Sequence, residues 1–288
     1  MLRLICLLVI ILASSCRQDT KLFNKISSNV SNITFQNRIE NTSELNILNY
    51  LYFYNGAGIA AGDFNNDGLV DLYFVANQDQ DKLYLNKGNL EFEDISQIAN
   101  ISTNNNWTTG VTTVDINNDG LLDLYICLVG AYSESKNILY VNKGLENGRP
   151  KFENESAIYG LDISSYSTQA VFFDYDLDDD LDMFLLNHSV HPNRTYGKGS
   201  TRETYSKESG DILFENVNGK FIDVSQEKGI FQGKTGYGLG LSVSDLNNDG
   251  YPDLYIGNDF FENDYLYLNQ NGQKFKEVIS TNTMALGH

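Results

Sequence analysis

A nine-residue motif that occurs four times constrains the fold of this chain more than any other feature. The copies begin at Asp63, Asp115, Asp174 and Asp245 and read DFNNDGLVD, DINNDGLLD, DYDLDDDLD and DLNNDGYPD. Every copy carries a side-chain oxygen at positions 1, 3, 5 and 9. Ca²⁺ takes about six to eight oxygen ligands and tolerates irregular geometry. The motif is therefore typical of a short loop that wraps a calcium ion.

The residues that follow the motif distinguish it from an EF-hand. An EF-hand loop needs a bidentate Glu at position 12 and a helix on each side. Position 12 is Phe74, Ile126, Leu185 or Ile256 in the four copies, and position 9 is followed by LYFVA, LYICL, MFLLN or LYIGN. These short runs of β-branched and aromatic residues predict strands. Each loop is therefore expected to lead directly into a strand.

A plain hairpin turn is the alternative for any single copy, because Asn-Asp-Gly is a turn signal that needs no metal. A turn does not need oxygens at positions 1, 3 and 9, and three or four clustered carboxylates repel one another without a cation. Four copies therefore favour about four Ca²⁺ sites. The side chains that would form them are Asp63, Asn65, Asp67 and Asp71; Asp115, Asn117, Asp119 and Asp123; Asp174, Asp176, Asp178 and Asp182; and Asp245, Asn247, Asp249 and Asp253.

Each motif lies at the same place in a larger repeat. The second copy predicts strands at 111–114, 124–128, 138–141 and 152–156, with Asn142-Lys143-Gly144 closing the third strand. Trp107, Tyr166 and Tyr237 each stand eight residues before a motif, which favours core packing over ligand binding. Four short strands per repeat, at a period of about 50–70 residues, describe a β-propeller blade. We expect an all-β fold of four-stranded antiparallel blades, with repeats at about 55–102, 107–162, 166–231 and 237–288.

A row of independent β-sandwich modules is the alternative architecture. It is disfavoured because a unit of about 50 residues without a disulfide is marginal as a separate domain. The mature chain has no disulfide framework, since Cys6 lies in a leader, Cys16 would be lipidated and Cys127 stands alone in a strand.

The stretches GIAAGDFNNDGLVDLYF and GLGLSVSDLNNDGYPDLYI resemble FG-GAP, or VCBS-type, repeats, the blades of propellers related to the integrin α-subunit head. The resemblance covers about residues 30–288. The stretch 33–37, followed by 52–58, resembles the bacterial relatives of cartilage acidic protein, which often carry an ASPIC/UnbV domain after the propeller. The resemblance implies Ca²⁺ in the loop between strands one and two of each blade. It also implies a propeller that is incomplete or part of a longer array.

The same resemblance adds one ligand to each predicted calcium site. This ligand is a backbone carbonyl at position 7 of the motif. The residues that would supply it are Leu69, Leu121, Asp180 and Tyr251.

The N-terminus has the pattern of an exported lipoprotein. Residues 1–15 combine a basic Arg3, an apolar run too short to span a bilayer, and small residues, as in a signal peptide. Ala13-Ser14-Ser15-Cys16 resembles a lipobox with Ala13 in place of the usual Leu or Val, so ordinary signal cleavage is the alternative. We expect lipidation at Cys16, a tether over 16–32, and a location at the outer membrane or surface of a bacterium. The lipid alone would contact the membrane.

The charge balance excludes nucleic acid as a partner. The chain has 38 acidic and 20 basic residues and a formal charge of −18. Nucleic-acid binding needs a basic surface instead. Its expected role is to bind a glycan or protein ligand at the cell surface, or to mediate adhesion.

One insertion, at 187–210, is locally basic and accounts for the longest spacing between motifs. Long loops on a rigid scaffold often carry function, so this loop is the candidate recognition site. The alternative is a solvated loop that only covers the edge of a blade. A carbohydrate-active enzyme, a lyase or hydrolase, is the competing class, although no G-x-S-x-G motif is present and no catalytic residue is predicted. A zinc site at its His-x-x-His lacks an evident third ligand. The candidate ligand-binding residues are His188, His191, Arg194, Tyr196 and Arg202.

Overall fold

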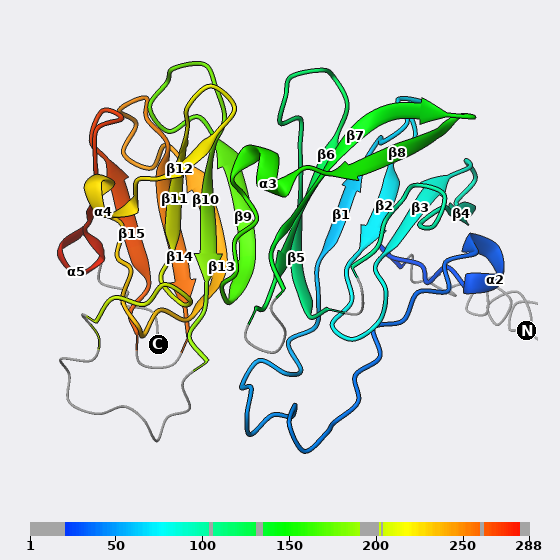
Figure 1. Cartoon of the computed structure of the whole chain (residues 1–288), viewed down its shortest axis with the longest axis horizontal. Helices are drawn as coiled ribbons and strands as arrows, with labels where there is room; N and C mark the ends of the chain where they lie inside the picture. The colour runs from blue at the N-terminus through cyan, green and yellow to red at the C-terminus, as the bar shows by residue number, and fades with distance from the viewer. Residues whose placement is uncertain are drawn as a thin grey trace, which may run out of the picture.

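The computed structural model describes residues 21–103, 106–130, 135–190, 202, 204–259 and 262–282. Within these residues, sixteen strands form four separate antiparallel sheets of four strands each. Each sheet is one repeat of the sequence, and the sheets follow one another across the molecule as the blades of a four-bladed β-propeller (Figure 1). The predicted all-β propeller of four-stranded antiparallel blades is confirmed.

The strands of each blade follow chain order from the innermost strand outward. Blade 1 consists of β1 (Ile59–Gly62), β2 (Asp71–Phe74), β3 (Lys82–Asn86) and β4 (Phe92–Asp94). Blade 2 consists of β5 (Thr108–Val114), β6 (Asp123–Leu128), β7 (Ile138–Glu146) and β8 (Arg149–Asn154). Blade 3 consists of β9 (Ser167–Phe173), β10 (Asp182–Asn187), β11 (Ile212–Asn216) and β12 (Phe221–Asp223). Blade 4 consists of β13 (Gly238–Ser244), β14 (Asp253–Asn258), β15 (Tyr265–Asn269) and β16 (Phe275–Glu277).

Four helices of four residues each supplement the strands in the described part of the chain. They are α2 (Ser28–Ser31), within the predicted tether, and α3 (Ser156–Tyr159), α4 (Ser225–Lys228) and α5 (Ile279–Asn282), which follow the last strands of blades 2, 3 and 4. None of the helices in this part is long and apolar enough to cross a membrane.

The hydrophobic core lies in layers between neighbouring blades. Successive side chains of a strand point to opposite faces of its sheet. In β6, Leu124 therefore packs in one cluster with Tyr73 of blade 1, whereas Tyr125 packs in another with Met183 of blade 3. All six residues of β6 and of β10 are buried, because a neighbouring blade covers each face. The apolar runs after the motifs are thus explained by burial on both sides.

Two glycines on innermost strands allow neighbouring blades to approach closely. A Cβ on Gly110 would lie 2.1 Å from the carbonyl oxygen of Thr168, and one on Gly238 would lie 2.3 Å from Cδ1 of Leu186. Thr109 Oγ1 spans the same junction, since it donates to the carbonyl of Ser167 at 2.7 Å. Side chains at these two positions would therefore force blades 2, 3 and 4 apart.

The third and fourth strands of blade 2 differ from their predicted bounds. β7 continues past Asn142 to Glu146, with a bulge between Asn142 and Leu145, and β8 begins at Arg149. The predicted closure at 142–144 and the predicted end of strand four at 156 are therefore wrong. The longer hairpin has a long-range partner, because Arg149 forms an ion pair with Glu93 of blade 1 at 2.5 Å.

The part of the chain before β1 that contains Tyr50 and Phe53 packs across the ends of the innermost strands. Figure 1 shows this segment at the end of the sheets opposite the loops that join β5 to β6 and β9 to β10. Its Tyr50 and Phe53 share an aromatic cluster with Trp107 and Tyr237, and Tyr166 packs against that cluster. The prediction that the three aromatic residues before the motifs serve core packing is confirmed.

Candidate metal centre

The four motifs, numbered here loop one to loop four in chain order, fold around their first carboxylate. In loop one, Asp63 Oδ1 accepts from the Asp67 N–H at 3.0 Å and Oδ2 accepts from the Gly68 N–H at 2.7 Å. Loops two, three and four repeat both bonds from Asp115, Asp174 and Asp245. These hydrogen bonds from backbone N–H groups to the first carboxylate hold the loop in shape before any ion binds.

Loop three reaches this shape with more backbone strain than the others. Gly68, Gly120 and Gly250 hold the positive φ at position 6, where loop three has Asp179 at φ 71°. Leu177 at position 4 also has a positive φ, 64°, where the other loops have Asn. A residue such as Leu in this region carries a cost on the order of 1–3 kcal/mol. Strain of this size persists where the surrounding structure enforces it.

The ninth residue of each loop is a buried Asp that ties the loop to the third strand. Asp123 Oδ2 accepts from the Ile116 N–H at 2.9 Å, and its Oδ1 accepts from the Asn142 N–H at 2.7 Å. The same two bonds recur at Asp71, Asp182 and Asp253. A carboxylate has about four lone-pair sites. Each of these Asp residues therefore keeps capacity for a cation.

The pKa is raised for the position-9 carboxyl groups of Asp71, Asp123 and Asp182. Burial is the main cause, the backbone N–H donors oppose it, and the other loop carboxylates add to it. The pKa rises to about 6 for Asp71 and Asp123 and to about 7 for Asp182. A cation would favour the charged form of the same groups.

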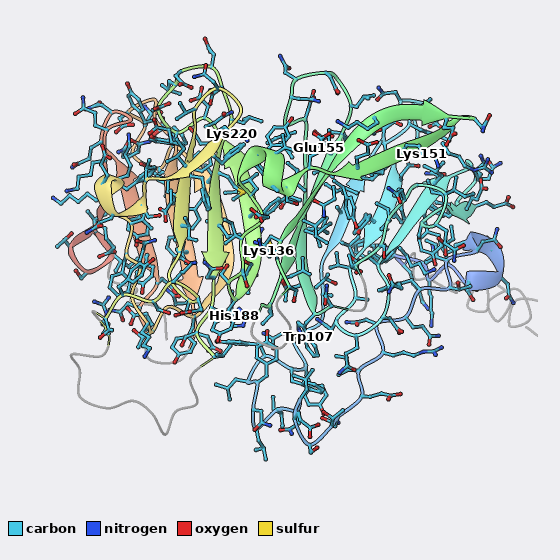
Figure 2. The ribbon with its side chains drawn as sticks, viewed as in Figure 1. Trp107, Lys136, Lys151, Glu155, His188 and Lys220 are labelled. Atoms are coloured by element: carbon cyan, nitrogen blue, oxygen red, sulfur yellow. The ribbon has the colours of Figure 1, made fainter. Side chains whose placement is uncertain are left out.

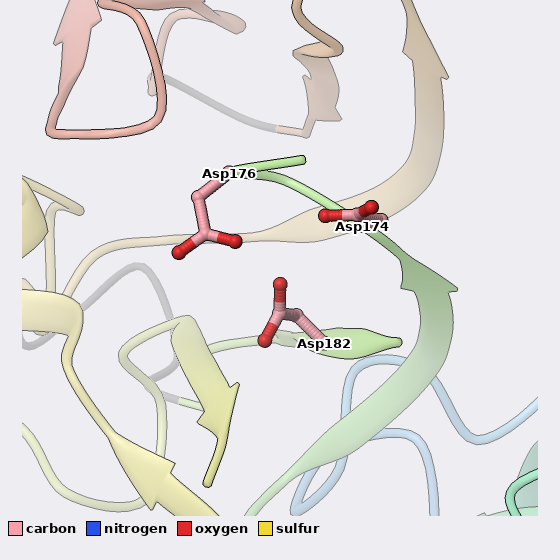
Figure 3. A group of neighbouring side chains, drawn as sticks. All are labelled: Asp174, Asp176 and Asp182. Carbon is pink, nitrogen blue, oxygen red and sulfur yellow. The ribbon is translucent and has the colours of Figure 1, made fainter. Parts of the chain in front are cut away.

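Loop three concentrates carboxylate oxygens most strongly. Asp174, Asp176 and Asp182 each place one oxygen within 4.8 Å of the others, and Figure 3 shows the three side chains around a shared space. Oδ1 of Asp176 and Oδ1 of Asp180 are buried and have no hydrogen-bond partner. Burial followed by the neighbouring carboxylates raises the pKa of both groups. An all-oxygen donor set with unpartnered buried atoms fits a hard cation such as Ca²⁺.

In the other three loops, the side chains at positions 3 and 5 are hydrogen-bonded to each other. Asn65 Nδ2 donates to Asp67 Oδ2 at 2.9 Å in loop one. Asn117 and Asp119 form the equivalent bond in loop two, and Asn247 and Asp249 form it in loop four. The Asp at position 3 of loop three replaces the donor with a second carboxylate. Loop three is therefore the loop whose charges are least balanced by the protein itself.

An Asn recurs in the third strand of each blade, and in blades 2 and 4 it makes contacts between blades that the sequence pattern did not predict. Asn142 Nδ2 donates to the Phe64 carbonyl in loop one, at 3.0 Å, and Asn269 Nδ2 donates to the Tyr175 carbonyl in loop three, at 2.7 Å. These bonds join the loop of one blade to a strand of the next. The signal was present, because Asn86, Asn142, Asn216 and Asn269 recur at one position of the repeat.

A second repeated polar residue braces the opposite end of the third strand. Oδ1 of Asn137 accepts from the Leu128 N–H at 2.8 Å, and Oδ1 of Asp211 accepts from the Asn187 N–H at 2.9 Å. Asp81 and Asp264 do the same in blades 1 and 4. These residues lie just before the third strand, and their bonds hold the backbone at the end of the second strand.

His188 and Arg202, from the basic insertion, already have partners within the fold. His188 is 0% exposed, its Nε2 lies 3.0 Å from Tyr50 Oη, and its backbone bridges to Tyr237. Burial lowers the pKa of His188 to about 3. Arg202 donates through Nε and Nη2 to Glu262, at 2.9 and 2.7 Å, and lies over the Phe231 ring. The other expected residues, His191, Arg194, Tyr196 and Cys16, lie outside the described residues.

Comparison with known proteins places the chain in a repeat family. Residues 63–126 match the FG-GAP-like repeat and residues 237–273 match the FG-GAP repeat. Cartilage acidic protein 1 of Mus musculus is 32% identical over 133 residues, 45% of this chain and 20% of that protein. Its Xenopus tropicalis counterpart is 26% identical over 205 residues, 70% of this chain and 28% of that protein.

A T-cell immunomodulatory protein homolog of Plasmodium yoelii yoelii is 24% identical over 264 residues, 75% of this chain and 35% of that protein. The chain thus spans between a fifth and about a third of the length of these relatives. The matched repeat segments contain loops one, two and four, and the remaining blade has the same strand order and loop bonds. The chain is therefore an FG-GAP repeat protein.

Proposed function

We propose that this chain is a calcium-stabilised β-propeller that binds a glycan or protein ligand. An FG-GAP propeller is a scaffold suited to ligand binding or adhesion. The observation that supports calcium is the buried, unpartnered Oδ1 of Asp176 in loop three, together with the grouping of its carboxylate with those of Asp174 and Asp182. A buried polar atom without a partner costs about 1–3 kcal/mol, and more where it is charged. A cation coordinated there removes that cost.

The loop residues would hold the ion through the oxygens at positions 1, 3, 5 and 9 and the carbonyl at position 7. A bound ion supplies positive charge to a cluster of carboxylates that otherwise repel one another. The protein contributes the positioning. Asp123 and its equivalents hold the loop against the third strand, and Asn142 and Asn269 connect it to the adjacent blade. Calcium binding would thus stiffen one whole end of the propeller.

Calorimetric titration with Ca²⁺ tests the proposal. Wild-type protein stripped of metal should take up Ca²⁺ and take up Mg²⁺ poorly, because Mg²⁺ demands near-octahedral geometry. Asp176→Asn should lose or weaken one site, whereas Glu227→Gln, an exposed acid on α4, should behave as wild type. Wild-type protein that takes up no Ca²⁺, or an Asp176→Asn variant with unchanged uptake, would contradict the site.

The enzyme alternative gains no support from the insertion residues that the structure describes. His188 is enclosed by aromatic rings, and the Nε and Nη2 atoms of Arg202 are bonded to Glu262. A catalytic group must reach its substrate within hydrogen-bonding distance. Neither side chain is presented in this way, so a binding role is the better-supported function.

We further propose export and lipid anchorage at Cys16, on the strength of the apolar run and the Ala-Ser-Ser-Cys junction. Expression with labelled palmitate should label the wild-type protein but not Cys16→Ser. Cys6→Ser is the matched control and should retain the label, because it lies within the predicted leader. Equal labelling of all three proteins, or of none, would reject lipidation at this residue.

A further inference from the structure

A cavity of about 380 Å³ lies on the propeller axis, at the end opposite the nine-residue loops. Its walls are the first residues of the innermost strands of all four blades, including Ile59, Thr109, Gln169 and Leu239. Small-molecule sites commonly have volumes of about 300–1,000 Å³. We propose that this axial cavity binds a neutral saccharide. This inference deepens the binding role proposed above and does not depend on calcium.

The lining of the axial cavity is uncharged. Among the described residues that surround it there is no Asp, Glu, Lys or Arg, although the chain as a whole has 58 such residues. A charged ligand would lie there without a counter-ion, which is costly in a partly enclosed site. The lining therefore favours a neutral ligand.

His188 belongs to the cavity lining, but its ring nitrogens are enclosed by protein. The residue is 0% exposed, its Nε2 contacts Tyr50 Oη at 3.0 Å, and its Nδ1 is buried without a hydrogen-bond partner. Because a ligand in the cavity does not reach a buried atom, its polar contacts are expected from the exposed amides of the lining instead.

The remaining lining offers both amide groups and apolar surfaces. The side chains of Asn55 and Gln169 are exposed and make no hydrogen bond to another described residue. Trp107, Ile59 and Leu239 contribute apolar surface to the same cavity. Figure 2 shows Trp107 and His188 at this end of the sheets, and both rings contact Tyr50. A sugar ring combines hydroxyls for the amides with C–H groups for the apolar walls.

The sole tryptophan of the chain allows a direct test. Trp107 lines the cavity, so its fluorescence reports occupancy. We would titrate the calcium-loaded protein with glucose, galactose, mannose, xylose, N-acetylglucosamine, cellobiose and lactose, and with glucuronate as a charged probe. At least one neutral sugar should give a saturable change. Gln169→Ala should weaken its affinity about fivefold, the effect of losing one net hydrogen bond of about 1 kcal/mol.

Two controls make the outcome decisive. Gln97→Ala changes an exposed glutamine at the periphery of blade 1 and should bind as wild type. Because Gln169 is exposed, its variant should melt as wild type does, which excludes loss of folding. Three results would overturn the inference: no saturable change at about 10 mM sugar, well above a dissociation constant of about 1 mM; equal affinity in Gln169→Ala; or binding of glucuronate alone. Calcium uptake is measured separately, so failure of the saccharide site leaves the calcium proposal standing.

Discussion

Asp211 shows how one buried residue can set the pH dependence of the whole fold. It is 4% exposed, and burial raises its pKa from 3.8 to about 8, against the opposing hydrogen bond from the Asn187 N–H. Because the folded pKa exceeds the unfolded one, the folded state holds the proton more tightly. Its contribution to the free energy of unfolding is therefore complete below about pH 3.8. It is lost progressively as the pH rises to about 8.

Replacement of Asp211 by Asn should remove this pH dependence. Asn137 occupies the same position in blade 2 and accepts the same kind of backbone bond, so the amide fits. At saturating Ca²⁺, the melting temperature of Asp211→Asn should gain on that of the wild type between about pH 4 and pH 8. Asp264→Asn, the same substitution at the half-buried equivalent position in blade 4, is the matched control for the change from carboxylate to amide. Parallel curves for Asp211→Asn and wild type would show that the carboxylate stays charged.

Asn142 and Asn86 form a matched pair that isolates the bond between blades. Both accept a turn N–H and donate to the position-8 carbonyl of their own blade. Asn142 also donates to the Phe64 carbonyl of blade 1. Asn142→Ala leaves that buried carbonyl unpaired and should cost about 1–3 kcal/mol, with a smaller loss for Asn86→Ala. Urea denaturation of both variants measures the difference, and equal losses would mean that the contact between blades contributes nothing.

At the scale of elements, the sequence predicts the parts of the structure that are determined by hydrogen bonds between residues close to each other in the chain. The loops fold through bonds between residues at most seven positions apart, such as Asp123 Oδ2 with the Ile116 N–H, so their oxygens could be located from spacing alone. The strands after them were recognisable because both faces are buried. Chain segments with distant partners were not. β7 extends to Glu146 while Arg149 of the same hairpin pairs with Glu93, and no local pattern announces that contact.

His188 is the clearest case in which contacts with distant parts of the chain, and not the local sequence, determine the environment of a residue. Its neighbours in the sequence are polar and basic, which favoured a recognition loop. Tyr50, 138 residues away, contacts its ring nitrogen, and Tyr237 pairs with its backbone. His188 therefore continues the buried end of β10 and does not begin an exposed loop. Its place beside the axial cavity could be inferred only once the blades were assembled.

An ion pair between Arg202, within the basic insertion, and Glu262 helps to anchor the insertion to blade 4. Arg202 is half-exposed, but the side chain of Glu262 is only 6% exposed, and Thr235 Oγ1 also donates to it. Arg202→Ala leaves Glu262 buried with less compensation. After allowance for solvent at the exposed partner, we expect a loss of about 1 kcal/mol and faster proteolysis near residue 202. Lys151→Ala breaks an exposed pair with Glu146 and should have little effect; an Arg202→Ala variant as resistant as Lys151→Ala would show that the anchor is dispensable.

At the scale of the molecule, stability is distributed over layers between blades. Each of three core clusters joins only two neighbouring blades, as in other repeat architectures. In the described part of the chain, Cys127 is buried as a free thiol, so no disulfide there reinforces the layers. The bonds from Asn142 and Asn269 connect the loops of one blade to the next. A ligand that stiffens the loops therefore stabilises the contacts between blades as well as the blades themselves.

Removal of calcium should therefore destabilise the whole propeller. If each site has a dissociation constant on the order of 10⁻⁴ M, about 1 mM Ca²⁺ stabilises the fold by roughly 1.4 kcal/mol per site. Four independent sites would supply about 5–6 kcal/mol, comparable with the net stability of a typical domain, about 5–15 kcal/mol. Since 1 kcal/mol shifts the melting temperature by about 2–4 °C at this size, excess EDTA should lower it by about 10–20 °C. Added Ca²⁺ should restore it and Mg²⁺ should restore little, whereas Asp123→Ala should lose about one site's share. A melting temperature that EDTA leaves unchanged would mean that the four loops act as hairpin turns, held by their backbone hydrogen bonds alone.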